Sequence, residues 1–145
     1  MVKSFLKKGK RQIGMALLAS AVLIGGTTTV AQAASTPTAQ FSFTVKTSST
    51  KGTPSSSSAV KATSADYAIF NISSLSNSSY GVWMRAGLGS YSNYSVASSE
   101  QKFTTSTQKK SYYLSGKKKQ GSSYIAVGRL VPGSPKVTVK GYMTP

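Results

Sequence analysis

Few side chains in this 145-residue sequence could carry out acid–base or nucleophilic chemistry. Asp66 and Glu100 are its only carboxylate side chains, and it contains no histidine and no cysteine. It therefore lacks an imidazole that titrates near neutral pH, a thiol nucleophile, and the usual ligands of zinc, haem and iron–sulfur clusters. We expect no metal site and no cofactor.

The two carboxylates could in principle form the acid pair of a glycosidase. Asp66 precedes a predicted strand and Glu100 lies in the polar segment VASSEQK, so each is more simply interpreted as a solvated acid beside a lysine. A Ser–Lys dyad is a second alternative, but serine and lysine are so frequent that no spacing singles out one pair. We therefore expect the protein not to be an enzyme, and a hydrolase is the least favoured alternative.

The charge of the chain is strongly one-sided, with 18 Lys and Arg against two Asp and Glu and a net charge of +16. Five of these cations lie in residues 1–12, before an apolar run over residues 13–26 and the small-residue pattern Ala31-Gln32-Ala33. This order predicts a secretory signal peptide over residues 1–33. The alternative is a membrane anchor, but the run is shorter than the roughly 20 apolar residues that a span requires. The long basic beginning resembles the signal peptides of Gram-positive bacteria.

Cleavage after Ala33 leaves one predicted domain, residues 34–145, with 13 cations, two acids and a net charge of +11. We expect a secreted protein that is free or associated with the cell wall. A positive field of this size attracts polyanions at low salt. Outside a Gram-positive cell the abundant polyanions are teichoic acid phosphates and anionic membrane lipids. No nucleic-acid-binding motif is present, so we expect no specific nucleic acid partner.

The densest run of positive charge is Lys117-Lys118-Lys119, one predicted strand after Lys109-Lys110. Tyrosines flank these lysines, and a basic loop with exposed rings is suited to binding an anionic polymer. Alternatively, the run is a solvated hairpin tip that keeps a serine-rich surface soluble and free of edge-to-edge aggregation. Trp83 and Arg85 share a strand face, where the ring lies either in the core or in a carbohydrate platform. The candidate anion- or polymer-binding residues are Lys109, Lys110, Lys117, Lys118, Lys119, Tyr112, Tyr113 and Arg85.

Apolar and polar residues alternate with period two in several short segments, which is typical of β-strands. Residues 46–64 are rich in Ser, Thr and Lys and predict a long exposed loop. Short strands at this spacing predict an all-β fold, a single antiparallel β-sandwich or partly open barrel of about seven strands after a cleaved signal helix. The predicted strands are residues 41–45, 67–72, 82–88, 101–107, 110–115, 123–131 and 136–143, of which 101–107 is the candidate edge.

The early segment FSFTVK (residues 41–46) and the closing segment KVTVKGY (residues 136–142) carry a family resemblance. With the signal peptide and the Ser/Thr/Lys-rich body, the chain resembles a family of small uncharacterised secreted β-rich proteins of Gram-positive bacteria. The middle departs from that family, since VWMRAGL stands where an aromatic-ended strand is expected. The resemblance implies an exported β-rich protein and supplies no activity. In size and export route the chain is also similar to secreted β-sandwich bacteriocins, without a shared motif.

Three functions follow from these observations. The favoured one is a non-catalytic cationic protein that adheres to anionic cell-envelope polymers or to an anionic membrane surface. A secreted bacteriocin-like antibacterial protein uses the same charge against a competitor, and growth inhibition by the purified protein would separate it from the first. A hydrolase would lose its activity when Asp66 or Glu100 is replaced by alanine.

Overall fold

The computed structural model describes residues 36–145, and the predicted signal peptide and signal helix of residues 1–33 lie outside the described residues. Residues 36–145 form nine strands, and they contain no helix of the length and hydropathy needed to span a membrane. The strands are β1 (Ala39–Val45), β2 (Thr53–Val60), β3 (Tyr67–Leu75), β4 (Val82–Gly89), β5 (Tyr94–Val96), β6 (Gln101–Phe103), β7 (Gln108–Tyr112), β8 (Ser123–Leu130) and β9 (Val137–Thr144).

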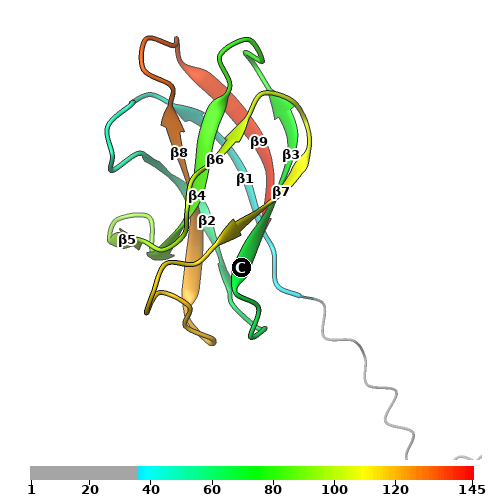
Figure 1. Ribbon diagram of the computed structural model, residues 1–145, viewed down its shortest axis with the longest axis vertical. Coiled ribbons are helices and arrows are strands. Elements are labelled where there is room, and N and C mark those ends of the chain that lie inside the picture. Colours follow the sequence, from blue (N-terminus) through cyan, green and yellow to red (C-terminus); the bar gives the residue numbers. More distant parts are fainter. Residues whose placement is uncertain (1–35) are drawn as a thin grey trace, which may run out of the picture. The chain divides into compact units, whose positions relative to one another are not determined.

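The strands form two antiparallel sheets that pack as a β-sandwich (Figure 1). The first sheet has the order β1-β9-β3-β7 and the second has the order β2-β8-β4-β5, with β6 also paired to β4. This architecture confirms the predicted all-β class and the predicted sandwich. The predicted number of about seven strands is too low, because β2 and β5 were not predicted. The predicted central strand at residues 67–72 is β3, which lies between β9 and β7. The predicted edge strand at residues 101–107 forms only over residues 101–103, as the short strand β6.

The core follows from the alternation of side chains along the strands. On β4, Val82, Met84 and Ala86 are fully buried, as the sequence predicts for one face of this strand. On β9, Val137, Val139 and Met143 are equally buried, and Phe41 and Val45 of β1 meet them from the neighbouring strand. Burial of these apolar side chains supplies the main force that holds the two sheets together, because the chain has no disulfide.

The predicted long loop over residues 46–64 is wrong for residues 53–60, which form β2 at the edge of the second sheet. The segment has few apolar residues because an edge strand pairs through its backbone and needs only a few inward side chains. Ser55 and Ala59 supply these and are buried. The Ser55 hydroxyl accepts the backbone N–H of Ala126 at 3.1 Å beside a bulge between Pro54 and Ser58. A serine-rich strand of this kind has no hydrophobic signature.

The alternative interpretation of the lysine run as a hairpin tip is also wrong, because β7 belongs to the first sheet and β8 to the second. The connecting residues 113–122 therefore cross from one sheet to the other at one end of the sandwich (Figure 1). The Lys117-Lys118-Lys119 run lies in this crossing segment. Consequently its neighbours come from both sheets, and a simple hairpin would not bring them together.

Candidate functional site

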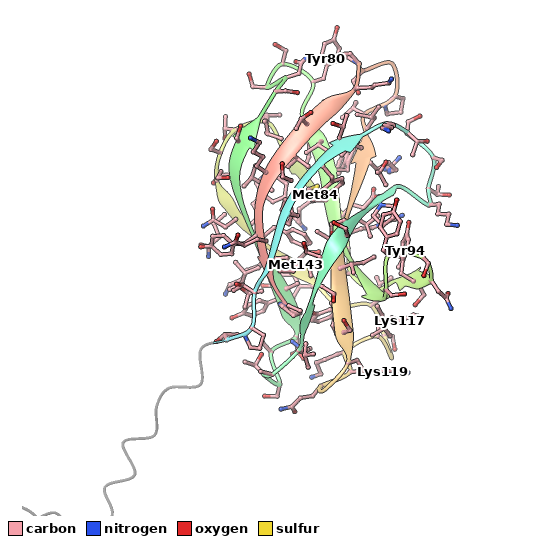
Figure 2. The ribbon with its side chains drawn as sticks, turned by 180° about the vertical axis from the view of Figure 1, so that it is seen from behind. Tyr80, Met84, Tyr94, Lys117, Lys119 and Met143 are labelled. Atoms are coloured by element: carbon pink, nitrogen blue, oxygen red, sulfur yellow. The ribbon has the colours of Figure 1, made fainter. Side chains whose placement is uncertain are left out.

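The crossing segment 113–122 is held to the sandwich by Tyr124, the first large residue of β8. The Tyr124 side chain is fully buried. Its hydroxyl donates to the Lys117 carbonyl at 2.6 Å and accepts the Lys119 backbone N–H at 2.8 Å. Figure 2 shows Lys117 and Lys119 at the same end of the sandwich, opposite the end that carries Tyr80. These two hydrogen bonds therefore fix the backbone of the basic run.

A second set of backbone contacts joins this segment to the residues between β2 and β3. The Lys61 N–H donates to the Ser122 carbonyl at 3.0 Å, and the Gly121 N–H donates back to the Lys61 carbonyl at 2.9 Å. The Tyr113 N–H donates to the Asp66 carbonyl at 2.9 Å. We call this part of the molecule the basic end; it comprises residues 61–67, Lys110, Tyr112 and residues 113–122.

The three lysines of the run differ in their surroundings. Lys118 forms an ion pair with the exposed Asp66, and this hydrogen bond and charge lower the pKa of the Asp66 carboxyl. The expectation that Asp66 is a solvated acid beside a lysine is therefore confirmed. Lys117 donates to the Ser95 hydroxyl at 3.2 Å, and Lys119 is exposed with no ion pair among the described residues. Lys117 and Lys119 keep their charge uncompensated by any described acid.

Lys110 and Tyr112 of β7 lie on the outer face of the first sheet. The Lys110 ammonium lies 4.1 Å from the centre of the Tyr67 ring, and the Tyr67 and Tyr112 rings meet edge to face at 5.8 Å. Tyr112 is 57% exposed. Lys109 points elsewhere, because successive strand residues alternate. Its ammonium donates to the Lys102 carbonyl at 2.6 Å. The structure thus joins Lys110 and Tyr112, with Tyr67 added, and separates Lys109 from them.

Tyr113 lies inside the basic end, where it supports other side chains. Its ring packs on Tyr124 at 5.2 Å between centres, and burial raises the pKa of the Tyr113 hydroxyl. The Lys61 ammonium lies 4.6 Å from the same ring. Lys61 is fully buried and its ammonium has no hydrogen-bond partner among the described residues, so burial, followed by the charge of Lys118, lowers its pKa.

Lys61 was not predicted from the sequence because it directly follows β2, in the segment 46–64 that was predicted to be a loop. Once β2 is recognised, Lys61 continues the inward parity of Ala59, and that alternation is the signal that could have found it. Sequence reasoning also missed Tyr67, which is brought to Lys110 by the pairing of β3 with β7.

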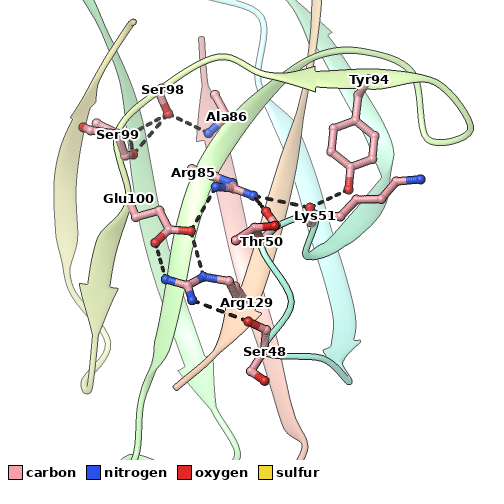
Figure 3. Close-up of polar contacts among 11 residues, drawn as sticks. Ser48, Thr50, Lys51, Arg85, Ala86, Tyr94, Ser98, Ser99, Glu100 and Arg129 are labelled. Carbon is pink, nitrogen blue, oxygen red and sulfur yellow. Dashed lines mark hydrogen bonds and ion pairs between the residues drawn. The ribbon is translucent and has the colours of Figure 1, made fainter. Parts of the chain in front are cut away.

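Arg85, the remaining candidate, is 9% exposed and takes part in a separate ion cluster (Figure 3). Its guanidinium lies 3.1 Å from the Glu100 carboxylate and donates to the Thr50 carbonyl. Arg129 binds the same carboxylate with two hydrogen bonds, of 2.9 and 2.5 Å. This bidentate contact raises the pKa of Arg129. Through the Thr50 and Ser48 carbonyls, the two arginines also join the loop before β2 to the second sheet.

Two interpretations change as a result. Glu100 is not a solvated acid beside a lysine, because it holds two arginines and its side chain is only 21% exposed. Trp83 lies on the outward face of β4, partly exposed, and the cation beside its ring is Arg129, 6.0 Å from the ring centre. Each carboxylate is thus bound in its own ion pair. Among residues 36–145 no cluster of three metal-ligating acids exists.

The basic end collects five of the 13 cations of residues 34–145, namely Lys61, Lys110, Lys117, Lys118 and Lys119. Of its exposed members, Lys110 lies on the Tyr67 ring, which the exposed Tyr112 contacts. Exposed positive charge of this kind attracts anions at low salt. Comparisons of the sequence and structure with protein-family models, curated proteins and solved structures found no match. The interpretation of this site therefore depends on its own geometry and charge.

Proposed function

We propose that this chain is a small secreted, non-catalytic protein that adheres to anionic polymers of the cell envelope through its basic end. The observation that carries the proposal is that two separate segments bring lysines to one end of the sandwich. Lys110 lies on the Tyr67 ring, which the exposed Tyr112 contacts, and Lys118 of the lysine run pairs with Asp66, the residue before Tyr67. The backbone there is held by Tyr124 and by the segment at Lys61, so the ammonium groups do not have to be ordered from a mobile loop when an anion binds.

The binding would be multivalent and electrostatic. A single exposed ammonium–anion contact contributes about 0.2–1 kcal/mol, so no one lysine holds a polymer alone. Three contacts to one chain contribute about 1.5 kcal/mol, which is roughly tenfold in affinity. Repeated anions on the polymer raise the effective concentration for the second and third contacts. The screening length falls from about 10 Å at 0.1 M salt to about 3 Å at 1 M, and binding should weaken accordingly.

The predicted export route favours phosphate polymers of the cell wall as the partner. Teichoic acids carry repeated phosphates on a flexible chain, which suits lysines that lie on neighbouring strands and loops. The two described acids do not cancel the charge of the basic end. Asp66 neutralises only Lys118, and Glu100 is bound by two arginines on the second sheet.

The test is co-sedimentation of the purified protein with Gram-positive cell walls, with and without teichoic acid, at about 0.1 M and about 1 M salt. One variant carries Lys110→Gln, Lys117→Gln and Lys119→Gln. The matched control carries Lys46→Gln, Lys51→Gln and Lys136→Gln, three exposed lysines outside the basic end with the same change of net charge. We expect the first variant to lose about tenfold in affinity and the control to lose little.

Two results would overturn the proposal. Equal losses in the two triple variants would mean that net charge alone, without a site, causes adhesion. Retention on walls at about 1 M salt would mean that the contact is not electrostatic.

A further inference from the structure

A shallow hollow of about 220 Å³ opens beside the basic end, on the outer face of the first sheet. Tyr67 and Ile69 of β3, Thr144 of β9, and Thr63 and Ala65 of the preceding loop contribute to its lining. The lining combines an aromatic ring and aliphatic carbon with threonine hydroxyls. Its volume is below the roughly 300–1,000 Å³ of pockets that enclose drug-sized ligands, so it suits a single small ring.

A positive charge lies close to this hollow, on the ring of Tyr67. The ring of Tyr67 lines the hollow, and the same ring holds the Lys110 ammonium 4.1 Å from its centre. Tyr112 lies against the edge of that ring with more than half of its surface exposed. The nearby acidic side chain, Asp66, is paired with Lys118, and Thr36 and Pro145, the last described residue, complete the lining of the hollow.

We propose that the hollow, with Lys110 and Tyr112, binds one sugar-phosphate unit of an anionic glycopolymer. The carbon–hydrogen face of a pyranose packs against tyrosine rings, its hydroxyls find the threonine hydroxyls, and its phosphate meets the Lys110 ammonium. Inorganic phosphate alone would use only the ammonium, and a neutral sugar would use only the rings and hydroxyls. This inference rests on the proposed function, because it names the repeat unit that the basic end recognises.

The test is a titration of the purified protein with glucose 1-phosphate, glucose and inorganic phosphate, followed residue by residue by ¹H–¹⁵N NMR. We expect glucose 1-phosphate to shift the backbone signals of Tyr67, Ile69 and Thr144 and to bind about fivefold or more tightly than either other probe. Tyr112→Ser, which removes the exposed ring, and Ala65→Leu, which fills the hollow, should each weaken glucose 1-phosphate binding about fivefold. The matched control is Tyr91→Ser, since Tyr91 is 59% exposed and borders a different hollow.

Equal affinity for glucose 1-phosphate and inorganic phosphate, without shifts at the hollow, would overturn the inference. So would Tyr112→Ser and Ala65→Leu variants that both bind glucose 1-phosphate as the unchanged protein does.

The same variants in the wall assay separate this inference from the proposed function. If the Lys110, Lys117 and Lys119 triple variant loses wall binding while Ala65→Leu and Tyr112→Ser keep it, adhesion stands and sugar recognition fails. If glucose 1-phosphate binds in the hollow but walls are not bound at all, the proposed function fails and the sugar-phosphate site stands. Binding to phosphatidylglycerol vesicles that is unaffected by Ala65→Leu, with no response to glucose 1-phosphate, would assign the surface to a membrane and overturn the inference.

Discussion

Replacement of Lys61 by methionine should stabilise the protein. Lys61 is fully buried, its ammonium has no hydrogen-bond partner among the described residues, and the charge of Lys118 disfavours the ammonium more than the charge of Asp66 favours it. A buried polar group without a partner costs about 1–3 kcal/mol, and more when it is charged. The Tyr113 ring, 4.6 Å from the ammonium, offsets about 0.5–2 kcal/mol of that cost.

The balance predicts that Lys61→Met, which keeps an unbranched stem of similar length, raises the free energy of unfolding at pH 7 by about 1–2 kcal/mol. For a domain of this size about 1 kcal/mol corresponds to about 4–8 °C in Tm. The assay is thermal unfolding followed by circular dichroism. Lys110→Met is the matched control, because Lys110 is also close to a tyrosine ring but is exposed, so its replacement should change Tm little.

The pH dependence gives a second readout. The folded-state pKa of Lys61 is lowered from 10.5, so the unfolded chain binds the proton more tightly than the folded protein does. The free energy of unfolding of the unchanged protein should therefore rise with pH between the lowered folded-state pKa and 10.5. Over the same pH range, the difference in free energy of unfolding between the Lys61→Met variant and the unchanged protein should become smaller. A Lys61→Met protein that is less stable at pH 7, or a difference that does not change with pH, would refute the reasoning.

The remaining predictions concern the two acids and the anchor of the basic run. Glu100→Gln leaves the nearly buried guanidinium of Arg85 without its counter-charge. Urea unfolding should show that the free energy of unfolding falls by about 3 kcal/mol. A smaller fall than that caused by Asp66→Asn would mean that the ion cluster does not stabilise the fold. Asp66→Asn removes the ion-pair partner of Lys118, so the affinity for cell walls at low salt should rise about twofold. An unchanged affinity would mean that Lys118 takes no part in wall binding. Tyr124→Phe deletes both hydrogen bonds to the basic run and should lower stability by about 1–3 kcal/mol, with faster amide exchange at Lys119 as the specific sign; unchanged exchange would mean that Tyr124 does not hold the run.

Much of the fold could be predicted because alternation is a local property. The pattern along residues 41–45, 82–88 and 136–143 places apolar side chains on one face, and those strands form with that face buried. Strand β2 could not be predicted in this way, because an edge strand forms through backbone pairing with β8 and its serines show no alternation of hydrophobicity. The partition of strands between two sheets is not local either, so the β7–β8 connection was interpreted as a hairpin.

The candidate site was predictable in the same uneven way. The run Lys117-Lys118-Lys119 is visible in the sequence, and its position at an exposed connection is confirmed. Tyr67 and Lys61 are far from that run in the sequence and join it only through strand pairing and the crossing segment. Arg85 was grouped with the lysines because it is cationic, but its guanidinium is bound by Glu100.

The sequence by itself determines which chemical groups the protein possesses: many ammonium groups, two carboxylates, and neither imidazole nor thiol. These are properties of composition, and no arrangement of the chain alters them. Only the tertiary structure decides which charges are free, since that depends on distances between residues remote in sequence. The order of strands in the two sheets brings Lys110 to Tyr67 and Lys118 to Asp66, and it buries Lys61 away from water. Of the 13 cations of residues 34–145, five therefore lie at the basic end, and Arg85 and Arg129 form the ion cluster with Glu100.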